Sequence, residues 1–331
     1  MLDGYSAPDL LRVASVAPVR RLYLVTGGCG FIGSHLVEAL VARGDVVRVF
    51  DDLSHGRRER LPRGVEFIEG DVADPAALRR AIQDVDGCFH LAAVPSVVEC
   101  QSRWLEAHRT NLTGTINVFD AARRAQPGKP MPVVYASSAA IYGDRGATPL
   151  VEMLAPQPIS IAGADKAGCE LHARIAHAAH GVPTVGLRLF NVFGPRQLAN
   201  CAYPAVVPSF LAQCASRRAI TIFGDGGHVR DFVFVRDAVD AFLAAMARVR
   251  TAEVFNVCSG RATTMAELAR LIVRLTDIDT EITFLPPRAS DVRHSVGDPA
   301  VAARALGFVA TTELEAGLAT TLRAWHTVDA L

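Results

Sequence analysis

Short apolar runs alternate with helical patterns through the first half of the chain. Six runs have the length and composition of buried strands, at residues 22–26, 46–50, 65–69, 87–91, 132–136 and 184–189. Four segments between them have helical spacing of apolar positions, at 34–43, 75–83, 104–124 and 164–180. This alternation predicts an α/β fold with a doubly wound, mostly parallel sheet, whose ligands bind at the carboxyl ends of the strands.

The pattern changes after Arg188. Residues 191–210 hold prolines and few long periodic segments, and 220–234, 255–256 and 282–285 resemble isolated strands between short helices. We expect a smaller, interleaved second domain that closes over the first. The predicted division is an N-terminal extension at 1–20, a nucleotide-binding domain at 21–187 plus about 232–260, and a substrate domain at 188–231 and 261–331.

Composition narrows the class of protein. The chain has 331 residues, of which 50% are hydrophobic and 21% charged, as expected of a soluble globular protein. Its 34 basic and 34 acidic residues balance, so we expect neither nucleic acid nor a membrane surface as partner. The seven cysteines form no Cys-x-x-Cys pair and no metal-ligand spacing appears, which predicts reduced thiols in a cytoplasm and no metal.

A glycine-rich turn joins the first predicted strand to the first predicted helix. Gly27, Gly30 and Gly33 lie in the run Thr-Gly-Gly-Cys-Gly-Phe-Ile-Gly, and Gly28 gives an alternative spacing. Glycines let the chain turn sharply and let a pyrophosphate approach the backbone, while the next helix offers free N–H groups to the anion. The turn therefore predicts a dinucleotide site, with an ordinary tight turn as the simpler interpretation.

The second predicted strand ends in two acids. Asp51 and Asp52 stand a little under the roughly 20 residues downstream at which a carboxylate receives the ribose hydroxyls of the adenosine. An acid there favours NAD over NADP, because it would repel a 2′-phosphate. Arg57, Arg58 and Arg60 nearby keep NADP open.

Separated motifs at the later strand ends support this interpretation. They read Gly-Asp-Val at 70–72, His-Leu-Ala-Ala at 90–93, Tyr-Ala-Ser-Ser-Ala-Ala-Ile-Tyr-Gly at 135–143, Arg-Leu-Phe-Asn-Val-Phe-Gly-Pro-Arg at 188–196 and Phe-Gly-Asp-Gly-Gly-His-Val-Arg-Asp-Phe at 223–232. Together with Lys166 they resemble the extended short-chain dehydrogenase/reductase family, specifically its nucleotide-sugar 4-epimerases. The resemblance spans about residues 21–325. It implies a Rossmann-like fold, tightly held NAD, a UDP-sugar substrate and a homodimer formed by paired long helices.

The resemblance also implies roles for individual residues. Those expected to bind NAD are Gly27, Gly30, Phe31, Ile32, Gly33, Asp51, Asp52, Asp71, Val72, Leu91, Ala92, Ala93, Asn111, Lys166 and Phe190. Those expected to bind the nucleotide sugar are Ser138, Tyr142, Asn191, Val206, Val207, Phe223, Arg230, Arg288, Asp291 and Ser295. Ser138 would hold the sugar O4, and the two arginines would grip the diphosphate with forked guanidinium donors.

The catalytic position departs from the family. There, a tyrosine four residues before the lysine removes the hydroxyl proton, and its pKa is lowered by nearby cations. Here Lys166 is present, but Ala162 stands at the tyrosine position. Three explanations stay open: an engineered variant that binds without reacting, an enzyme that uses another proton carrier such as Tyr142, Ser138 or Cys169, or a natural pseudoenzyme that senses NAD or a nucleotide sugar.

The reaction type follows from what the resemblance lacks. The family's dehydratases carry an acid and a base directly after the serine, where this chain has Ala139 and Ala140, and the glutamate of decarboxylating relatives is also missing. Oxidation at C4, rotation of the ketone and return of hydride remain, which is 4-epimerisation. By the resemblance, Ser295 stands at the family position whose bulk decides whether an N-acetyl group at C2 is admitted. Its small side chain therefore favours UDP-N-acetylglucosamine and UDP-N-acetylgalactosamine over UDP-glucose and UDP-galactose. A uronic acid is the alternative, with Arg109, Arg196 and His294 as carboxylate partners.

Overall fold

A computed structural model describes residues 20–125, 128–198, 204–287 and 291–328. Seven parallel strands form the main sheet in the order β11-β6-β5-β4-β1-β2-β3. Their bounds are β1 Leu22–Thr26, β2 Val46–Asp51, β3 Glu66–Glu69, β4 Gly87–His90, β5 Val133–Ser138, β6 Thr184–Leu189 and β11 Ala252–Val257. The order reverses direction between β1 and β4, where a doubly wound sheet opens a crevice for ligands. The predicted fold class is confirmed.

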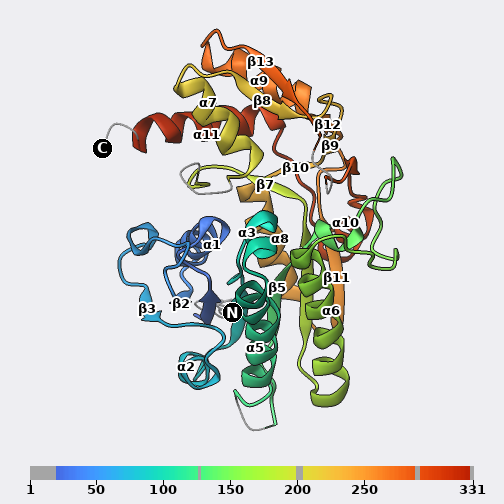
Figure 1. Cartoon of the computed structure of the whole chain (residues 1–331). Coiled ribbons are helices and arrows are strands. Elements are labelled where there is room, and N and C mark those ends of the chain that lie inside the picture. Colours follow the sequence, from blue (N-terminus) through green and yellow to red (C-terminus); the bar gives the residue numbers. More distant parts are fainter. Residues whose placement is uncertain (1–19, 126–127, 199–203, 288–290, 329–331) are drawn as a thin grey trace, which may run out of the picture.

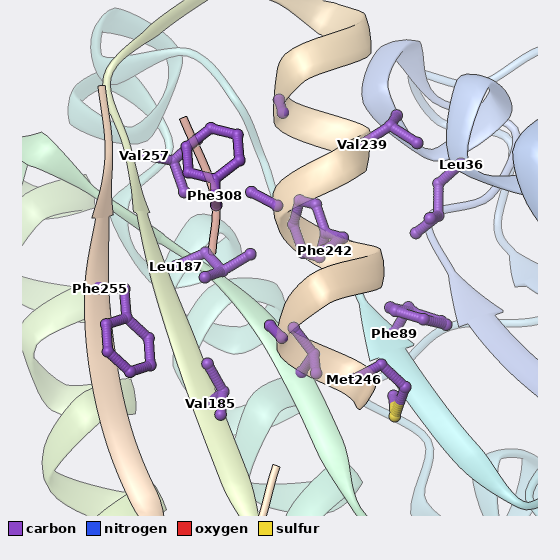
Figure 2. Packing of buried hydrophobic residues seen from close by; sticks show 14 of the residues in the cluster. Leu36, Phe89, Val185, Leu187, Val239, Phe242, Met246, Phe255, Val257 and Phe308 are labelled. Carbon is purple, nitrogen blue, oxygen red and sulfur yellow. The ribbon is translucent and has the colours of Figure 1, made fainter. Parts of the chain in front are cut away.

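Helices cover both faces of this sheet. On one face lie α1 (Phe31–Ala42), α8 (Val235–Arg248) and α10 (Ala300–Leu306), and on the other lie α2 (Pro75–Ala81), α5 (Gly114–Ala122) and α6 (Ile161–His180). Figure 2 shows the first of these layers, in which Phe242 and Met246 of α8 pack among side chains of β4, β6 and β11. Alternate strand residues supply the two cores, because successive side chains point to opposite faces.

The segment between β4 and β5 differs from the single helix predicted at 104–124. It folds as α3 (Val97–Ser102), α4 (Trp104–His108), a π-helical turn (Arg109–Thr113) and α5. Sequence analysis did not predict α3, because its six residues are too few to show a helical period. This short helix proves important, because it forms one wall of the cavity described below.

A smaller unit stands over the carboxyl ends of the strands (Figure 1). Its helices are α7 (Val206–Ala215), α9 (Met265–Thr276) and α11 (Leu314–Val328). Its strands form three small sheets: β8 (Ile220–Phe223) with β13 (Ile282–Leu285), β7 (Asn191–Phe193) with β10 (Phe232–Phe234), and β9 (Val229–Arg230) between β12 (Thr263–Thr264) and β14 (His294–Ser295). The strand expected at 220–234 is divided by a turn in which Gly224 and Gly226 have positive φ angles of 83° and 77°.

Contacts refine the predicted division of the chain. β11 joins the edge of the main sheet, and α8 packs on that sheet. However, α10 also packs against α8 and β11, and its Ala302 and Leu306 belong to the core of the larger unit. The chain therefore returns to the first unit within 261–331. No helix of the described residues is long and apolar enough to cross a membrane.

Candidate active site

The glycine turn after β1 has the geometry of an anion cradle. Gly27 has a positive φ of 70°, and its N–H donates to the Phe50 carbonyl across to β2 at 2.9 Å. A Cβ on Gly33 would lie 2.1 Å from the Gly27 carbonyl oxygen, so only glycine fits there. Gly30 caps α1 without a side-chain hydrogen bond. The first N–H groups of α1 are thus available to a pyrophosphate, as dinucleotide binding requires.

A cavity of about 710 Å³ opens from this turn. Among the residues predicted to bind NAD, its lining includes Gly27, Gly30, Phe31, Ile32, Gly33, Asp51, Asp52, Val72, Leu91, Ala92 and Ala93. These residues come from the ends of four neighbouring strands, so the fold brings them together as the sequence predicted. The size of the cavity and its mixture of apolar walls and polar groups fit a cofactor site.

The acids after β2 are held in fixed positions. Asp51 accepts hydrogen bonds from the backbone N–H groups of Cys29 and Leu53, both at 2.9 Å, so that its carboxylate ties the glycine turn to the strand end. Burial raises the pKa of Asp51 despite these bonds. Asp52 is exposed and accepts from the N–H and hydroxyl of Ser54. Asp71 forms an ion pair with Arg109, in which Arg109 Nη2 lies 3.2 Å from Asp71 Oδ2.

Two contacts across the cavity were not predicted. His55, in the loop after β2, pairs with Glu99 of α3 at 3.0 Å, and both line the cavity. Arg60 donates to the carbonyl of Arg196 at 2.9 Å and so joins the β2 loop to the loop after β7. These residues stand in loops and in helices too short to give a periodic signal, and only the tertiary structure brings them to one site.

Ala162 and Lys166 lie near the start of α6. The Ser160 hydroxyl caps this helix by accepting from the Gly163 N–H at 3.1 Å, and Ala162 is its second residue. Lys166 Nζ donates to the carbonyl of Ala136 at 2.8 Å, and Ala136 lines the cavity. Burial lowers the pKa of the Lys166 ammonium below its ordinary value. Lys166, which is predicted to act at the cofactor, thus contacts a residue that lines the cavity.

Ser138 and Asn111 occupy the neighbouring strand end and helix. Ser138 is partly buried, and its hydroxyl accepts from the Ala140 N–H at 3.1 Å, which leaves the hydroxyl proton available to another group. Asn111 is buried, and its side-chain oxygen accepts from the Val94 N–H at 2.8 Å. Its amide therefore positions the loop after β4.

The structure corrects the expectation for Tyr142. Its side chain is fully buried, and its hydroxyl donates to Asn256 Oδ1 at 2.7 Å and accepts from Arg188 at 2.8 Å. Arg188 in turn pairs with Glu170 at 2.7 Å inside the core. Burial raises the pKa of Tyr142 to about 12. Tyr142 belongs to a buried polar network, so its side chain is not exposed to a cavity in this structure, and its raised pKa disfavours proton transfer near neutral pH.

Two further side chains predicted to bind ligands pack in the cores of the two units. Phe190 is 5% exposed and packs in the larger core, with its ring centroid 6.4 Å from that of Tyr142. Val207 is 2% exposed and packs in the core of the smaller unit, whereas Val206, at the start of α7, is partly exposed. An apolar residue at the end of a helix or strand can face a ligand site or pack in a core. Phe190 and Val207 pack in the cores.

The residues expected at the diphosphate and the sugar lie in the smaller unit. Arg230 and Ser295 are direct neighbours in the pairing of β9 with β14, and both are partly buried. Burial lowers the pKa of Arg230, although Asp291 and Asp144 oppose this effect. Asn191 and Phe223 are partly buried at β7 and β8, and Asp291 is exposed. Arg288 lies outside the described residues.

Comparisons with known proteins agree with the site. The model of the NAD dependent epimerase/dehydratase family matches residues 23–258. A UDP-glucose 4-epimerase of Azospirillum brasilense is 32% identical over 92% of this chain and 91% of its own length. A UDP-N-acetyl-alpha-D-glucosaminuronate decarboxylase of Bacillus cytotoxicus is 31% identical over 81% of this chain and 84% of its own.

Solved structures match over nearly the whole chain. The UDP-glucose 4-epimerase of Thermotoga maritima with UDP-glucose has a TM-score of 0.89 at 35% identity, covering 93% of this chain and 99% of that one. The UDP-N-acetylglucosamine 4-epimerase of Methanobrevibacter ruminantium M1, in complex with UDP-N-acetylmuramic acid, has a TM-score of 0.88 at 32% identity, with coverage of 93% and 99%. With the glycine cradle, the strand-end acids and these matches together, the chain belongs to the NAD-dependent epimerase/dehydratase family.

Proposed function

We propose that this protein is an NAD-dependent 4-epimerase of a UDP-sugar, slowed by the alanine at position 162. The observation that carries the proposal is the position of Ala136. This residue lines the proposed cofactor cavity, and its carbonyl accepts a hydrogen bond from Lys166 Nζ. Bound NAD would take a hydride from the sugar C4 and return it. The chain must then hold the sugar and move one proton, with Ser138 positioned two residues further along the same strand.

The residues after Ser138 favour epimerisation over elimination. Ala139 and Ala140 form the first turn of a short 3₁₀ helix, Ala139–Tyr142, and present only methyl groups. Loss of water from the sugar needs an acid and a base close to the reacting carbons, and methyl groups supply neither. Decarboxylases occur among the relatives, but oxidation and return of hydride at C4 need no acid or base other than the one that moves the hydroxyl proton.

An N-acetylhexosamine substrate is supported by the pairing of β9 with β14. The register sets Ser295, the expected size filter for the C2 substituent, beside Arg230, the expected diphosphate ligand. A small side chain next to the phosphate clamp leaves room for an acetamido group. We therefore propose UDP-N-acetylglucosamine and UDP-N-acetylgalactosamine as the substrate pair.

The uronic acid alternative loses two of its three expected carboxylate partners. Arg109 pairs with Asp71, and Arg196 pairs with Glu38 of α1. His294 remains, as the neighbour of Ser295 in β14. The competing function is that of a sensor, which would bind NAD and a nucleotide sugar without catalysing a reaction. The observation that favours this function is Ala162 at the catalytic tyrosine position.

We also propose that the protein is cytoplasmic and forms a homodimer. Exposed apolar side chains gather on the helices that the resemblance assigns to dimerisation. Trp104 and Leu105 of α4 are 62% and 83% exposed, and Leu171 and Ile175 of α6 are 55% and 61% exposed. Apolar residues of this size are unfavourable in water, so burial against a second copy explains them.

Release of cofactor and turnover test the function together. The purified protein is denatured and the supernatant examined for NAD, and UDP-N-acetylglucosamine turnover is then compared between this chain and Ala162→Tyr. We expect bound NAD in both and at least about 10²-fold faster turnover in the tyrosine variant, the size of a restored acid/base group. Bound NAD with no turnover in either chain would favour the sensor, and absence of NAD from both would refute the cofactor assignment.

A further inference from the structure

We propose that Lys166 itself is the proton carrier of this site, exchanging a proton with the sugar hydroxyl through its Nζ. The inference rests on the proposed epimerase function. Lys166 and Ala162 are four residues apart on α6, so their side chains lie on one face of the helix. With a methyl group at position 162, this face of the helix carries no phenol beside the lysine, whose Nζ contacts the cavity-lining residue Ala136.

The other candidates for the proton carrier are removed by their surroundings. Tyr142 is fully buried and its hydroxyl is engaged on both sides. Cys169 is 1% exposed, donates to the Asn111 carbonyl at 3.2 Å, and has its pKa raised by burial. The aliphatic hydroxyl of Ser138 holds its proton too tightly to act alone near neutral pH. Of the groups considered, Lys166 remains.

The charges around Lys166 leave its amine free to titrate. Among the described residues, no ion pair joins it to a carboxylate, and its recorded hydrogen bond goes to a neutral carbonyl. Asp165 is buried beside it and its charge opposes the lowering of the Lys166 pKa, but burial is the larger effect, and one oxygen of this carboxylate pairs with His108 at 2.8 Å. The thiols of Cys100 and Cys169 are kept neutral because burial raises their pKa values.

The remaining titratable neighbour is His90 at the end of β4. Burial lowers the pKa of this imidazole to about 3, and the charge of Lys166 contributes to the shift. A neutral imidazole and neutral thiols cannot hold the lysine in its charged form, and burial disfavours that form further. A lysine in these surroundings can therefore give and take a proton closer to neutral pH than an exposed one.

The proton step balances without any further group. The sugar O4–H bond would break as the lone pair of the neutral Lys166 amine forms a new N–H bond, and NAD, when bound, would supply the hydride acceptor. On return of the hydride to the other face of the ketone, the Lys166 ammonium would give the same proton back to O4. One proton and one hydride leave and return, so no outside oxidant or acid is consumed.

The composition of the chain makes the proposal directly measurable. Lysine occurs at only two positions, Lys129 and Lys166, and Lys129 is exposed. Labelling with ¹³C,¹⁵N-lysine therefore gives two side-chain signals, of which Lys129→Arg assigns one and supplies an internal reference. We expect the Lys166 amine, in protein saturated with NAD, to titrate at a clearly lower pH than Lys129. Titration of both lysines together would overturn the proposal whether or not the protein turns over substrate.

Kinetics supply the second arm. Turnover of UDP-N-acetylglucosamine should rise with pH along the Lys166 titration, fall at least about 10²-fold in Lys166→Arg, and stay unchanged in Lys129→Arg. The affinity for NAD is measured separately in each variant, so that lost cofactor is not mistaken for lost proton transfer. Full turnover by NAD-loaded Lys166→Arg would overturn the lysine role and leave the epimerase intact. A depressed Lys166 titration with no turnover, even in Ala162→Tyr, would instead overturn the proposed function and with it this role.

Discussion

The cofactor cleft and the proposed sugar side of the molecule depend on different parts of the chain. In the cleft, the main determinants are backbone conformation and missing side chains, at Gly27 and Gly33, with Asp51 locked by two backbone N–H groups. On the sugar side, the expected determinants are side chains, of which Tyr142 and Val207 are buried in the cores. Glycine and strand-end motifs report backbone geometry directly, whereas a side chain reports its role only after its packing partners are known.

Gly33→Ala should break the cleft most completely. Its new Cβ would meet the Gly27 carbonyl oxygen at 2.1 Å, and backbone must shift to relieve the clash. We expect loss of NAD binding, measured by titration with NADH and fluorescence. Gly30→Ala is the matched control, because its Cβ would lie 3.1 Å from the same oxygen and needs only a small adjustment. Equal NAD affinity of the two variants would contradict the cradle.

Arg188→Met tests the buried network beneath the sugar side. Removing the guanidinium leaves the buried carboxylate of Glu170 without its 2.7 Å partner. Breaking such a pair costs about 3–5 kcal/mol, which urea denaturation measures as a lower midpoint. The double variant Arg188→Met with Glu170→Leu removes both charges and should recover part of the stability. If the double variant is as unstable as the sum of the single changes, charge burial is not the cause.

Tyr142→Phe sharpens the contrast between packing and chemistry. Deleting the hydroxyl leaves Asn256 Oδ1 and one Arg188 N–H without this partner, and we expect about 1–3 kcal/mol lower stability in urea. Turnover and KM in the Ala162→Tyr background should stay within a few-fold of the parent. A large loss of turnover with stability unchanged would return Tyr142 to the sugar pocket.

His90 gives the stability of the folded chain a pH dependence. It is buried between the hydroxyls of Thr26 and Thr115, and burial lowers its pKa from an ordinary 6.5 to about 3. Below pH 6.5 the unfolded chain takes up a proton that the folded chain refuses, so stability present above pH 6.5 is lost as pH falls toward 3. The slope from this group is at most about 1.4 kcal/mol per pH unit. His90→Asn should flatten it between pH 6 and 5, and an unchanged slope in urea midpoints would assign the acid sensitivity to other groups.

The amino-acid sequence by itself determined the strand and helix alternation, the cradle, the strand-end acids and the absence of a phenol at position 162. These features are local. An apolar period, a glycine spacing or a residue type does not depend on which distant segments of the chain pack together. Residues 22–26, 184–189 and 282–285 accordingly form strands at the predicted bounds.

The tertiary structure decided the rest. It placed α10 on the larger unit, brought His55 to Glu99 across the cavity, and sent Tyr142, Phe190 and Val207 into the core. It also placed the amine of Lys166 within hydrogen-bonding distance of the neutral Ala136 carbonyl, while the neighbouring carboxylate of Asp165 pairs with His108. Each of these outcomes depends on which distant segments pack together, and burial and charge pairing arise only from that packing.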